Sequence, residues 1–531
     1  MKETKQTNMN FENERLLHPL NEASTSSQSV KYPEIPNSIN VVSNLLDVNI
    51  SSQLITERQE SNNKNENILK EIMISVLSSS FALLCIFLIE TINIIMMGNT
   101  KNASLNLDSV GLGNIFLNFA GVLIAFGILG GMDTMGSHCY GYQNYELLGI
   151  FTIRTRIILN GLFFLFTVPC CLFCYKILTF INIYEPLAEN SYYYIIGMLP
   201  TILLTYNFNL NIRYVQVMQY YFYPSLIAIT AMLLHLLICY FNVMVLELDL
   251  LGTCISSFVT MSYCLIMSIY YILSANPCPE SLFFKPPTRT YELKEFYEYL
   301  KLCIYSGIQT YGDYIGYEVV CFMCSYLSQS SMATTLIVLN YANLIGYIYV
   351  GFSFPLAHFV GYYLGKRDYS MYKHCVFIFT WINIVSALIL GSTVLFFPKE
   401  ISALYTNDPE TLEKSSHIFK IWTIGVVSDI FNIMLQAILR GAGKQHITSI
   451  WNLVMSIVWM IPLSYYLCFI LKWDVFGIWI GCISYVVILT SVNTIYYFML
   501  DVEEASAIIY AQINEENVAT NMNYSPIKDI E

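Results

Sequence analysis

Charged residues are scarce in this sequence. Only 12% of its 531 residues are charged and 55% are hydrophobic, whereas roughly 25% of the residues in an average soluble domain are charged. Between about residue 71 and about residue 500, apolar runs of 20 or more residues contain almost no Lys, Arg, Asp or Glu. Each run is long enough to cross the ~30 Å hydrocarbon core of a bilayer. The composition therefore excludes a soluble globular protein and indicates a polytopic membrane protein.

The sequence also lacks a basic stripe and a disulfide framework. Because no run of Lys and Arg could neutralise phosphates, we expect no nucleic-acid partner. The 15 Cys residues lie almost entirely inside apolar runs, which is unlike the framework of a secreted domain. Cys321 and Cys324 have a metal-like spacing, but no second pair or nearby His accompanies them. We therefore predict no disulfides, no metal site and no cofactor.

The two ends of the chain are polar. Residues 1–70 lack the apolar stretch of a signal peptide and are rich in Asn, Ser and Glu, so we expect a disordered cytosolic arm. Residues 501–531 carry 1 basic and 7 acidic residues. We interpret this second segment as an acidic cytosolic tail that is solvated and disordered rather than a binding element.

Hydropathy predicts twelve membrane-spanning segments. They lie near residues 72–97, 109–132, 149–173, 190–212, 222–245, 251–275, 296–327, 334–362, 373–398, 416–440, 447–471 and 475–500. In lipid, every backbone N–H and C=O has to be paired within its own segment or in a closed barrel, and barrel strands are alternating segments of about 10 residues. The continuous apolar runs therefore predict an all-α polytopic membrane protein.

The basic residues between the spans predict the orientation. The loops after spans 2, 4, 6, 8 and 10, with their flanking turns, contain twelve Lys or Arg residues, and the loops on the other side contain six. Since basic residues favour the cytoplasmic side, we expect both termini in the cytoplasm. We expect a functional monomer in the lipid bilayer, in either the plasma membrane or a vacuolar or other internal membrane.

The chain divides into two similar halves. Residues 276–295 contain four Pro among charged residues, a composition typical of a linker. The linker separates an N-lobe of six spans, residues 71–275, from a C-lobe of six spans, residues 296–500. The segment that begins at Gly141 resembles the segment 224 residues later that begins at Gly365, and a second pair of segments is 225 residues apart. This duplication predicts two pseudo-symmetric lobes with a substrate between them, as in many transporters.

A few polar residues interrupt the apolar runs. Glu90 and Asn93 lie in the first span, Asp313 and Glu318 in the seventh, and Asp429 in the tenth. An acidic residue inside a span costs about 2.5 to 3.5 kcal/mol on insertion scales, so each one indicates a function. Desolvation makes a carboxyl group easier to protonate. These carboxylates therefore predict a proton site that also holds a cationic substrate in its ionised form.

Other side chains are candidates for contact with the substrate. Tyr314 and Tyr317 lie beside the carboxylates of the seventh span and could donate hydrogen bonds to them or face an organic cation. The candidates for the substrate cleft are these two tyrosines together with Glu90, Asn93 and Gln219.

A membrane enzyme is the alternative from a different functional class. It would need a cluster of histidines or a metal at one membrane face. His138, His235 and His358 are instead scattered over spans or span ends of both halves. We interpret them as structural histidines, and we predict that the protein is not an enzyme.

Four blocks of the sequence occur in an order that resembles one known family. Residues 133–141 read Asp-Thr-Met-Gly-Ser-His-Cys-Tyr-Gly, residues 313–318 read Asp-Tyr-Ile-Gly-Tyr-Glu, residues 340–365 form a third block, and Asp429, Arg440-Gly441-Ala442-Gly443-Lys444-Gln445, Asn452 and Pro462 form the fourth. These blocks look like motifs after the second helix and in the seventh, eighth, tenth and eleventh helices of the multidrug and toxic compound extrusion (MATE) transporters, especially the eukaryotic branch.

The resemblance covers roughly residues 72–500. It implies two six-helix lobes around a central cleft and export of organic cations or other small xenobiotics in exchange for H⁺. It implies cation-site residues Asp313, Glu318, Asn340 and Asp429 in the C-lobe. The alternatives on the same fold are Na⁺ coupling and transport of lipid-linked substrates, although a cleft for lipid-linked phosphates should contain Arg and Lys, which the sequence lacks in mid-span.

Overall fold

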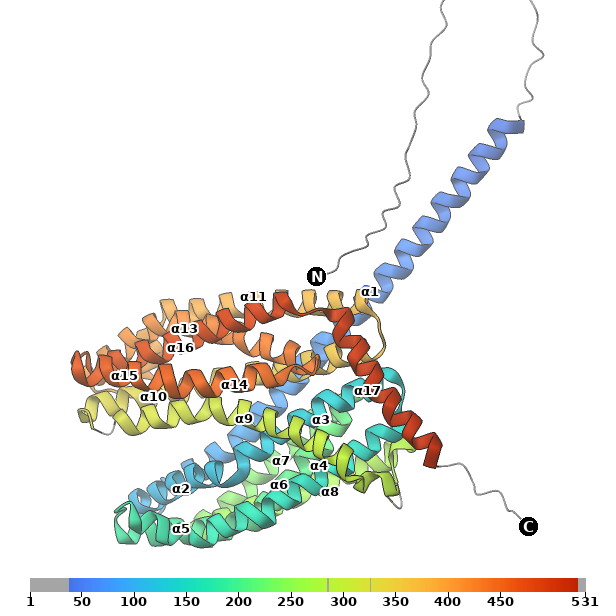
Figure 1. Ribbon diagram of the computed structural model, residues 1–531. Coiled ribbons are helices and arrows are strands. Elements are labelled where there is room, and N and C mark those ends of the chain that lie inside the picture. Colours follow the sequence, from blue (N-terminus) through green and yellow to red (C-terminus); the bar gives the residue numbers. More distant parts are fainter. Residues whose placement is uncertain (1–37, 284–285, 325, 524–531) are drawn as a thin grey trace, which may run out of the picture. The chain divides into compact units, whose positions relative to one another are not determined.

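The computed structural model describes residues 38–283, 286–324 and 326–523 (Figure 1). The chain divides into two units between Glu66 and Asn67. Helix α1 (Ser38–Met97) begins in the first unit and continues into the second. The helical residues 38–66 differ from the disordered arm that we expected. They contain neither Pro nor Gly, so nothing in this stretch breaks the helix that leads into the first span. Residues 1–37 lie outside the described residues.

The N-lobe is built from six spans, three of which contain a π-helical turn. The spans are Asn67–Met97 of α1; α2 (Ala103–Leu117), η1 (Asn118–Val122) and α3 (Leu123–Tyr142); α4 (Tyr145–Leu162), η2 (Phe163–Thr167) and α5 (Val168–Phe180); α6 (Glu185–Val217); α7 (Phe222–Tyr240) and η3 (Phe241–Val245); and α8 (Asp249–Ala275). Two short 3₁₀ helices, η4 (Pro279–Ser281) and η5 (Thr288–Tyr291), follow in the linker.

The C-lobe repeats the six-span pattern. Its elements are α9 (Leu293–Cys324), α10 (Gln329–Gly365), α11 (Tyr369–Phe396), the short α12 (Pro398–Ala403), α13 (Pro409–Gly441), a span made of α14 (Gln445–Met455), η6 (Ser456–Met460), α15 (Ile461–Tyr465) and η7 (Tyr466–Ile470), and α16 (Asp474–Met499). A last helix, α17 (Val502–Asn523), follows the twelfth span.

Eleven of the spans are long and apolar enough to cross a bilayer on composition alone. The twelfth, α9, has 32 residues but is less apolar because it contains Asp313 and Glu318. The prediction of an all-α fold with twelve membrane helices in two lobes is confirmed. Several helices extend beyond the predicted spans, such as α2 to α3, which covers 103–142 instead of 109–132. Hydropathy marks only the part of a helix that lies in hydrocarbon, and polar turns continue the helix beyond it.

The two lobes contact each other near one end of the bundle. The helices that end at Tyr142, Val217, Ala275, Gly365 and Gly441 all finish at the end where the linker lies, which we call the linker end. Helix α3 packs there against α9, α10 and α13 of the C-lobe, and α6 packs against α10. Figure 1 shows α3 and α9 side by side. The structure is therefore closed at its linker end.

Glycine allows the closest approach between α3 and α9. A Cβ atom added at Gly127 would lie 2.5 Å from Cα of Gly307 in the other lobe. A separation this short excludes any side chain at residue 127 unless a backbone moves. Small residues serve this purpose in membrane helices because association there depends on close van der Waals packing.

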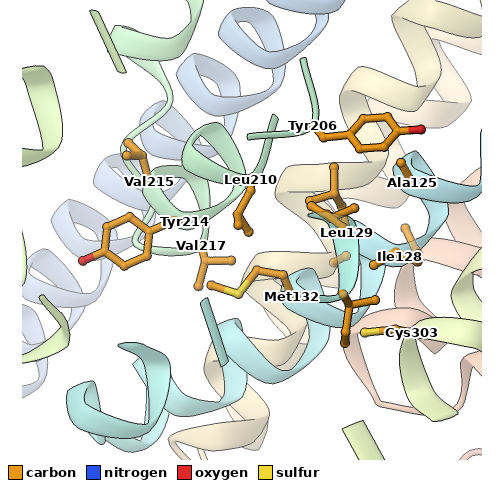
Figure 2. Packing of buried hydrophobic residues seen from close by; sticks show 14 of the residues in the cluster. Ala125, Ile128, Leu129, Met132, Tyr206, Leu210, Tyr214, Val215, Val217 and Cys303 are labelled. Carbon is orange, nitrogen blue, oxygen red and sulfur yellow. The ribbon is translucent and has the colours of Figure 1, made fainter. Parts of the chain in front are cut away.

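The N-lobe interior is filled by apolar side chains. Ile128, Leu129 and Met132 of α3 pack with Leu210 and Val217 of α6 in a single buried cluster (Figure 2). Lipid tails are as apolar as these side chains, so the cluster is stabilised by packing contacts more than by removal of surface from water.

The C-terminal segment is docked, which corrects the solvated tail that we predicted. Ala505, Ile509 and Ile513 of α17 are buried. The hydroxyl group of Ser506 donates a hydrogen bond to the carbonyl of Leu364 at 2.8 Å. Apolar residues every fourth position form one face of a helix, and this face lies on α10 and α3. Residues 524–531 lie outside the described residues.

Candidate functional site

Asp313 is the most closely supported of the intramembrane carboxylates. Nδ2 of Asn452 on α14 donates a hydrogen bond to Oδ1 of Asp313 at 2.8 Å, and the hydroxyl of Tyr485 on α16 lies 3.5 Å from the same oxygen. Helix α9 can approach α14 because a Cβ atom at Gly312 would lie only 3.0 Å from the backbone nitrogen of Leu453. The small residue next to Asp313 thus brings the carboxylate to its amide donor.

The other two predicted carboxylates of the C-lobe differ from Asp313. Asp429 on α13 lies within electrostatic reach of Asp313, and both side chains are partly exposed. Glu318 lies further along α9, which is α-helical throughout. Residues five positions apart on an α-helix are about 140° apart around its axis. The unbroken helix therefore keeps Glu318 on a different face from Asp313.

Tyr314 connects the carboxylates of the two lobes. Its hydroxyl lies within electrostatic reach of Asp313, Asp429 and Glu318 in the C-lobe and of Glu90 in the N-lobe. Glu90 is exposed, and Tyr314 is 39% exposed. We call these four acids the interlobe carboxylates. Tyr314 therefore interacts electrostatically with acidic side chains of both lobes.

Two further aromatic contacts join the lobes near this boundary. The ring centroids of Phe87 and Tyr347 are 4.7 Å apart, and those of Phe119 and Tyr311 are 5.9 Å apart. Tyr317, a predicted contact residue, lies within electrostatic reach of Asp429. Aromatic side chains of both lobes therefore meet at this boundary.

The structure places three further predicted site residues in different surroundings. Asn340 is exposed, but its amide donates to the carbonyl of Leu336 on its own helix at 2.8 Å. Asn93 is only 4% exposed and points into the N-lobe, toward α7 and α8, rather than into a cleft. Gln219 lies in the turn between α6 and α7 with a left-handed backbone, φ 67°, at the linker end. The hydropathy pattern does not show the direction of a side chain around its helix.

The structure reveals a second charged site, which the sequence reasoning missed. Nε2 of His358 on α10 lies 3.0 Å from Oδ1 of Asp133 on α3. Nε of Arg213 lies 3.7 Å from the same oxygen, and Nη1 of Arg440 lies 3.7 Å from Oδ2. Asp133, Arg213 and His358 are buried. We call these four residues the linker-end ion cluster.

The linker-end ion cluster holds the lobes together. Asp133 and Arg213 belong to the N-lobe, and His358 and Arg440 belong to the C-lobe. The hydroxyl of Tyr221 lies 2.8 Å from Nδ1 of His358, another contact from the N-lobe. Asp133 and Arg440 belong to motifs that the sequence analysis identified. Their contact, and that of Asp133 with His358, joins residues more than 200 positions apart and could not be predicted from local sequence.

A separate ion pair anchors the linker. Nη2 of Arg154, which is 0% exposed, donates to Oε2 of Glu295 at 2.7 Å and to the backbone carbonyl of Arg289 at 2.9 Å. Arg289 also contacts Glu295, at 3.2 Å. These bonds fasten η5 and the start of α9 to α4, so the connection between the lobes is fixed to the N-lobe.

Among the residues that the structure describes, no group of three or more His, Cys, Asp and Glu could hold a metal ion. The Cys321 and Cys324 pair lies on α9. Sγ of Cys324 contacts the hydroxyl of Thr335 at 3.1 Å. Cys324 therefore serves in packing and hydrogen bonding.

The chain is similar to transporters from animals and plants. It is 23% identical over 427 residues to "Multidrug and toxin extrusion protein 1" of Xenopus tropicalis, covering 80% of this chain and 73% of the relative. It is 22% identical over 410 residues to the human protein of that name, covering 75% and 69%. It is 23% identical over 447 residues to "Protein DETOXIFICATION 9" of Arabidopsis thaliana, covering 81% and 89%.

The fold is similar to those of solved transporter structures. The eukaryotic MATE transporter AtDTX14 superposes with a TM-score of 0.77 at 17% identity, covering 84% of this chain and 98% of the other. A MOP superfamily transporter from Pyrococcus furiosus superposes with a TM-score of 0.71 at 13% identity, covering 81% and 95%. The sequence model of the MatE family matches residues 79–241 and 311–466, in both lobes. The chain belongs to the MatE family of multidrug and toxin extrusion transporters.

Proposed function

We propose that this transporter exports organic cations or other small xenobiotics in exchange for protons. The observation that carries the proposal is the intramembrane carboxylate of Asp313, which accepts a hydrogen bond from Asn452, interacts with Asp429 and is followed by Tyr314. An organic cation placed there would be attracted by the acids and by the aromatic ring. Of the alternatives on the same fold, transport of lipid-linked phosphates is not favoured, because Arg213 and Arg440 are both ion-paired with Asp133.

Protons and substrate would compete for the same carboxylates. Asp313 in its ionised form accepts the hydrogen bond from Asn452 and attracts the cation. Protonation removes the negative charge, and the cation then leaves. Each pH unit of gradient supplies ~1.4 kcal/mol, and one elementary charge that crosses 100 mV supplies ~2.3 kcal/mol. These energies are sufficient for uphill transport of a cation.

The linker-end ion cluster would control access to the site. When the linker end opens, α3 must separate from α10 and α13, so the contacts of Asp133 with His358 and Arg440 must break. The Lys and Arg distribution favours cytoplasmic termini. In that orientation, the structure is closed toward the cytoplasm. A single chain would be sufficient for alternating access, because it contains both lobes.

Efflux from proteoliposomes tests the proposal. The purified protein is reconstituted with a fluorescent organic cation, and efflux is measured with an imposed pH gradient and without Na⁺. We expect gradient-dependent efflux that Asp313→Asn and Glu318→Gln abolish. Glu400→Gln is the matched control, because Glu400 is an exposed C-lobe carboxylate on α12. Efflux that requires Na⁺ instead of a pH gradient would contradict proton coupling and favour the Na⁺-coupled alternative.

A further inference from the structure

Helix α17 is joined closely to the C-lobe. Only two residues separate it from the end of α16 at Met499. Oδ1 of Asp501 accepts hydrogen bonds from the backbone N–H groups of Glu503 and Glu504, both at 3.0 Å. Such a cap satisfies donors that the first turn of a helix leaves unpaired. The short connection and the cap therefore make α17 move together with α16.

The first half of α17 contacts the end of α10, which also belongs to the C-lobe. The hydroxyl of Ser506 donates to the carbonyl of Leu364 at 2.8 Å, in the last turn of α10, where the carbonyls have no partner within the helix. Cζ of Arg367 lies 3.5 Å from the ring centroid of Tyr510, which is a cation–π contact. Both contacts stay within one lobe and can persist when the lobes move.

The second half of α17 contacts the N-lobe. Tyr142 is the last residue of α3, and its hydroxyl donates a hydrogen bond to Oδ1 of Asn514 at 2.8 Å. Its ring meets that of Tyr510 edge to face, with 5.3 Å between the centroids. Tyr510 therefore contacts both Arg367 of the C-lobe and Tyr142 of the N-lobe.

These contacts lie where the two lobes meet. A Cβ atom at Gly365 of α10 would lie 2.5 Å from the carbonyl oxygen of His138 on α3, so the two backbones touch. Leu364, which accepts from Ser506, is next to Gly365, and Tyr142 lies one helical turn after His138. Figure 1 shows α17 crossing the linker end over helices of both lobes. It thus spans the junction that has to open during alternating access.

Opening of the linker end would break one set of these contacts. Helix α3 then separates from α10, and Tyr142 moves with α3. Asn514 and Tyr510 stay with the C-lobe, because α17 is joined to α16 and bonded to Leu364. The contacts of Tyr142 with α17 therefore exist only while the linker end is closed, and they stabilise that state in addition to the linker-end ion cluster.

We propose that α17 is an intramolecular latch, held on the C-lobe by Ser506 and closed by the contacts of Tyr510 and Asn514 with Tyr142, and that it restrains the opening of the linker end during transport. The inference goes beyond the proposed function and requires alternating access, but no particular coupling ion. One neutral hydrogen bond changes an equilibrium constant by about two- to tenfold. The latch therefore slows each opening without preventing it.

Hydrogen exchange of the full chain in lipid nanodiscs tests the latch. Residues 354–361 of α10 serve as the reporter. They are all buried, and His358 among them contacts Asp133 of α3. Opening separates this stretch from α3 and admits water, so the rate of exchange there reports the fraction of protein that is open.

The hydroxyl of Tyr142 is the first group to remove. Tyr142→Phe loses the donor to Asn514 and keeps the ring, so exchange of residues 354–361 should become about two- to tenfold faster than in the wild type. Tyr145→Phe is the matched control, because Tyr145 is a half-buried tyrosine at the same end whose ring packs on Tyr140, with 5.9 Å between the centroids. Wild-type exchange in both variants overturns the proposal.

A variant of α17 itself separates an open latch from a lost helix. Asn514→Ala removes the acceptor for Tyr142, whereas Glu504→Ala, the control, changes an exposed residue of the same helix. Alanine favours the helix in both variants. We expect faster exchange of residues 354–361 in Asn514→Ala alone, with unchanged exchange of residues 502–509, which Ser506 and Ile509 still hold in place. An equal effect of both variants on residues 354–361, or none, overturns the latch.

Transport distinguishes the latch from the proposed function. Efflux of the organic cation is measured from proteoliposomes of the same variants with and without a pH gradient. We expect efflux about two- to tenfold faster from Tyr142→Phe than from the wild type, since the linker end opens more readily. Efflux that stays equal or becomes slower overturns the restraint on transport. Efflux that ignores the gradient in every variant contradicts the proposed proton coupling, and the exchange of residues 354–361 still decides whether the latch exists.

Discussion

Asp133 on α3 and His358 on α10 contact each other across the boundary between the two lobes, with 3.0 Å between Oδ1 and Nε2. The residues are 225 positions apart in the sequence, and both are buried. Arg213 and Arg440 lie at the same carboxylate. Closure of the linker end therefore depends on the side chain of Asp133.

Asp133→Asn should destabilise the closed protein. The substitution removes the charge that compensates two arginines, and a buried pair that loses one partner typically costs about 3 kcal/mol or more. Thermal unfolding in detergent should show a lower Tm. Asp108→Asn is the matched control, because Asp108 is an exposed residue of α2. Equal melting temperatures for the two variants would contradict the role of the linker-end ion cluster.

Gly127→Ala should impair transport more than folding. The added methyl group would meet Gly307 of the other lobe at 2.5 Å, so the lobes could not close fully at the linker end. We expect efflux to fall at least about tenfold, which corresponds to 1.4 kcal/mol, with little change in expression. Gly111→Ala is the matched control, since a Cβ atom there has nothing within 4 Å. Normal efflux from the Gly127 variant would show that such close contact is not needed.

Ile509→Ala should release α17 from the lobes. Ile509 is 4% exposed, whereas its neighbour Ile508 is 39% exposed, so the two substitutions differ in burial and not in chemistry. Truncation of a buried Ile costs about 2 kcal/mol or more. Hydrogen exchange in residues 502–514 should become faster in the Ile509 variant and stay unchanged in Ile508→Ala. Similar exchange in both variants would mean that α17 is not held by this face.

Acid should loosen the start of α13 through Asp408. Hydrogen bonds from the Thr411 hydroxyl and from its backbone N–H lower the pKa of Asp408. The folded pKa thus lies below the unfolded value of about 3.9. These bonds therefore stabilise the helix start above that pH, and the contribution is lost as the pH falls through the folded pKa.

Hydrogen exchange in the first two turns of α13 measures this effect. Protection of residues 409–415 in the wild type should decrease as the pH falls below about 4. Asp408→Asn keeps a capping oxygen but cannot titrate, so its protection should not depend on pH in this range. The same acid dependence in both proteins would assign the loss to another group.

The transmembrane architecture could be predicted because the bilayer leaves few alternatives. A run of about 20 apolar residues has to form a helix, and the structure has helices at all twelve predicted places. The acidic residues were equally visible, since Glu90 and Asp313 interrupt otherwise apolar runs. The docking of α17 could have been found as well, because Ala505, Ile509 and Ile513 follow a helical period within an acidic segment.

What the sequence by itself determined was therefore the number of membrane-spanning helices, their approximate limits and the acidic residues among them, because these depend on the local pattern of apolar and polar residues. Only the tertiary structure decided the partners. The direction of Asn93 toward His235 and the contact of Asp133 with His358 depend on helix rotation and on packing between distant segments. Those quantities result from all side chains of a lobe together, so a local pattern does not contain them.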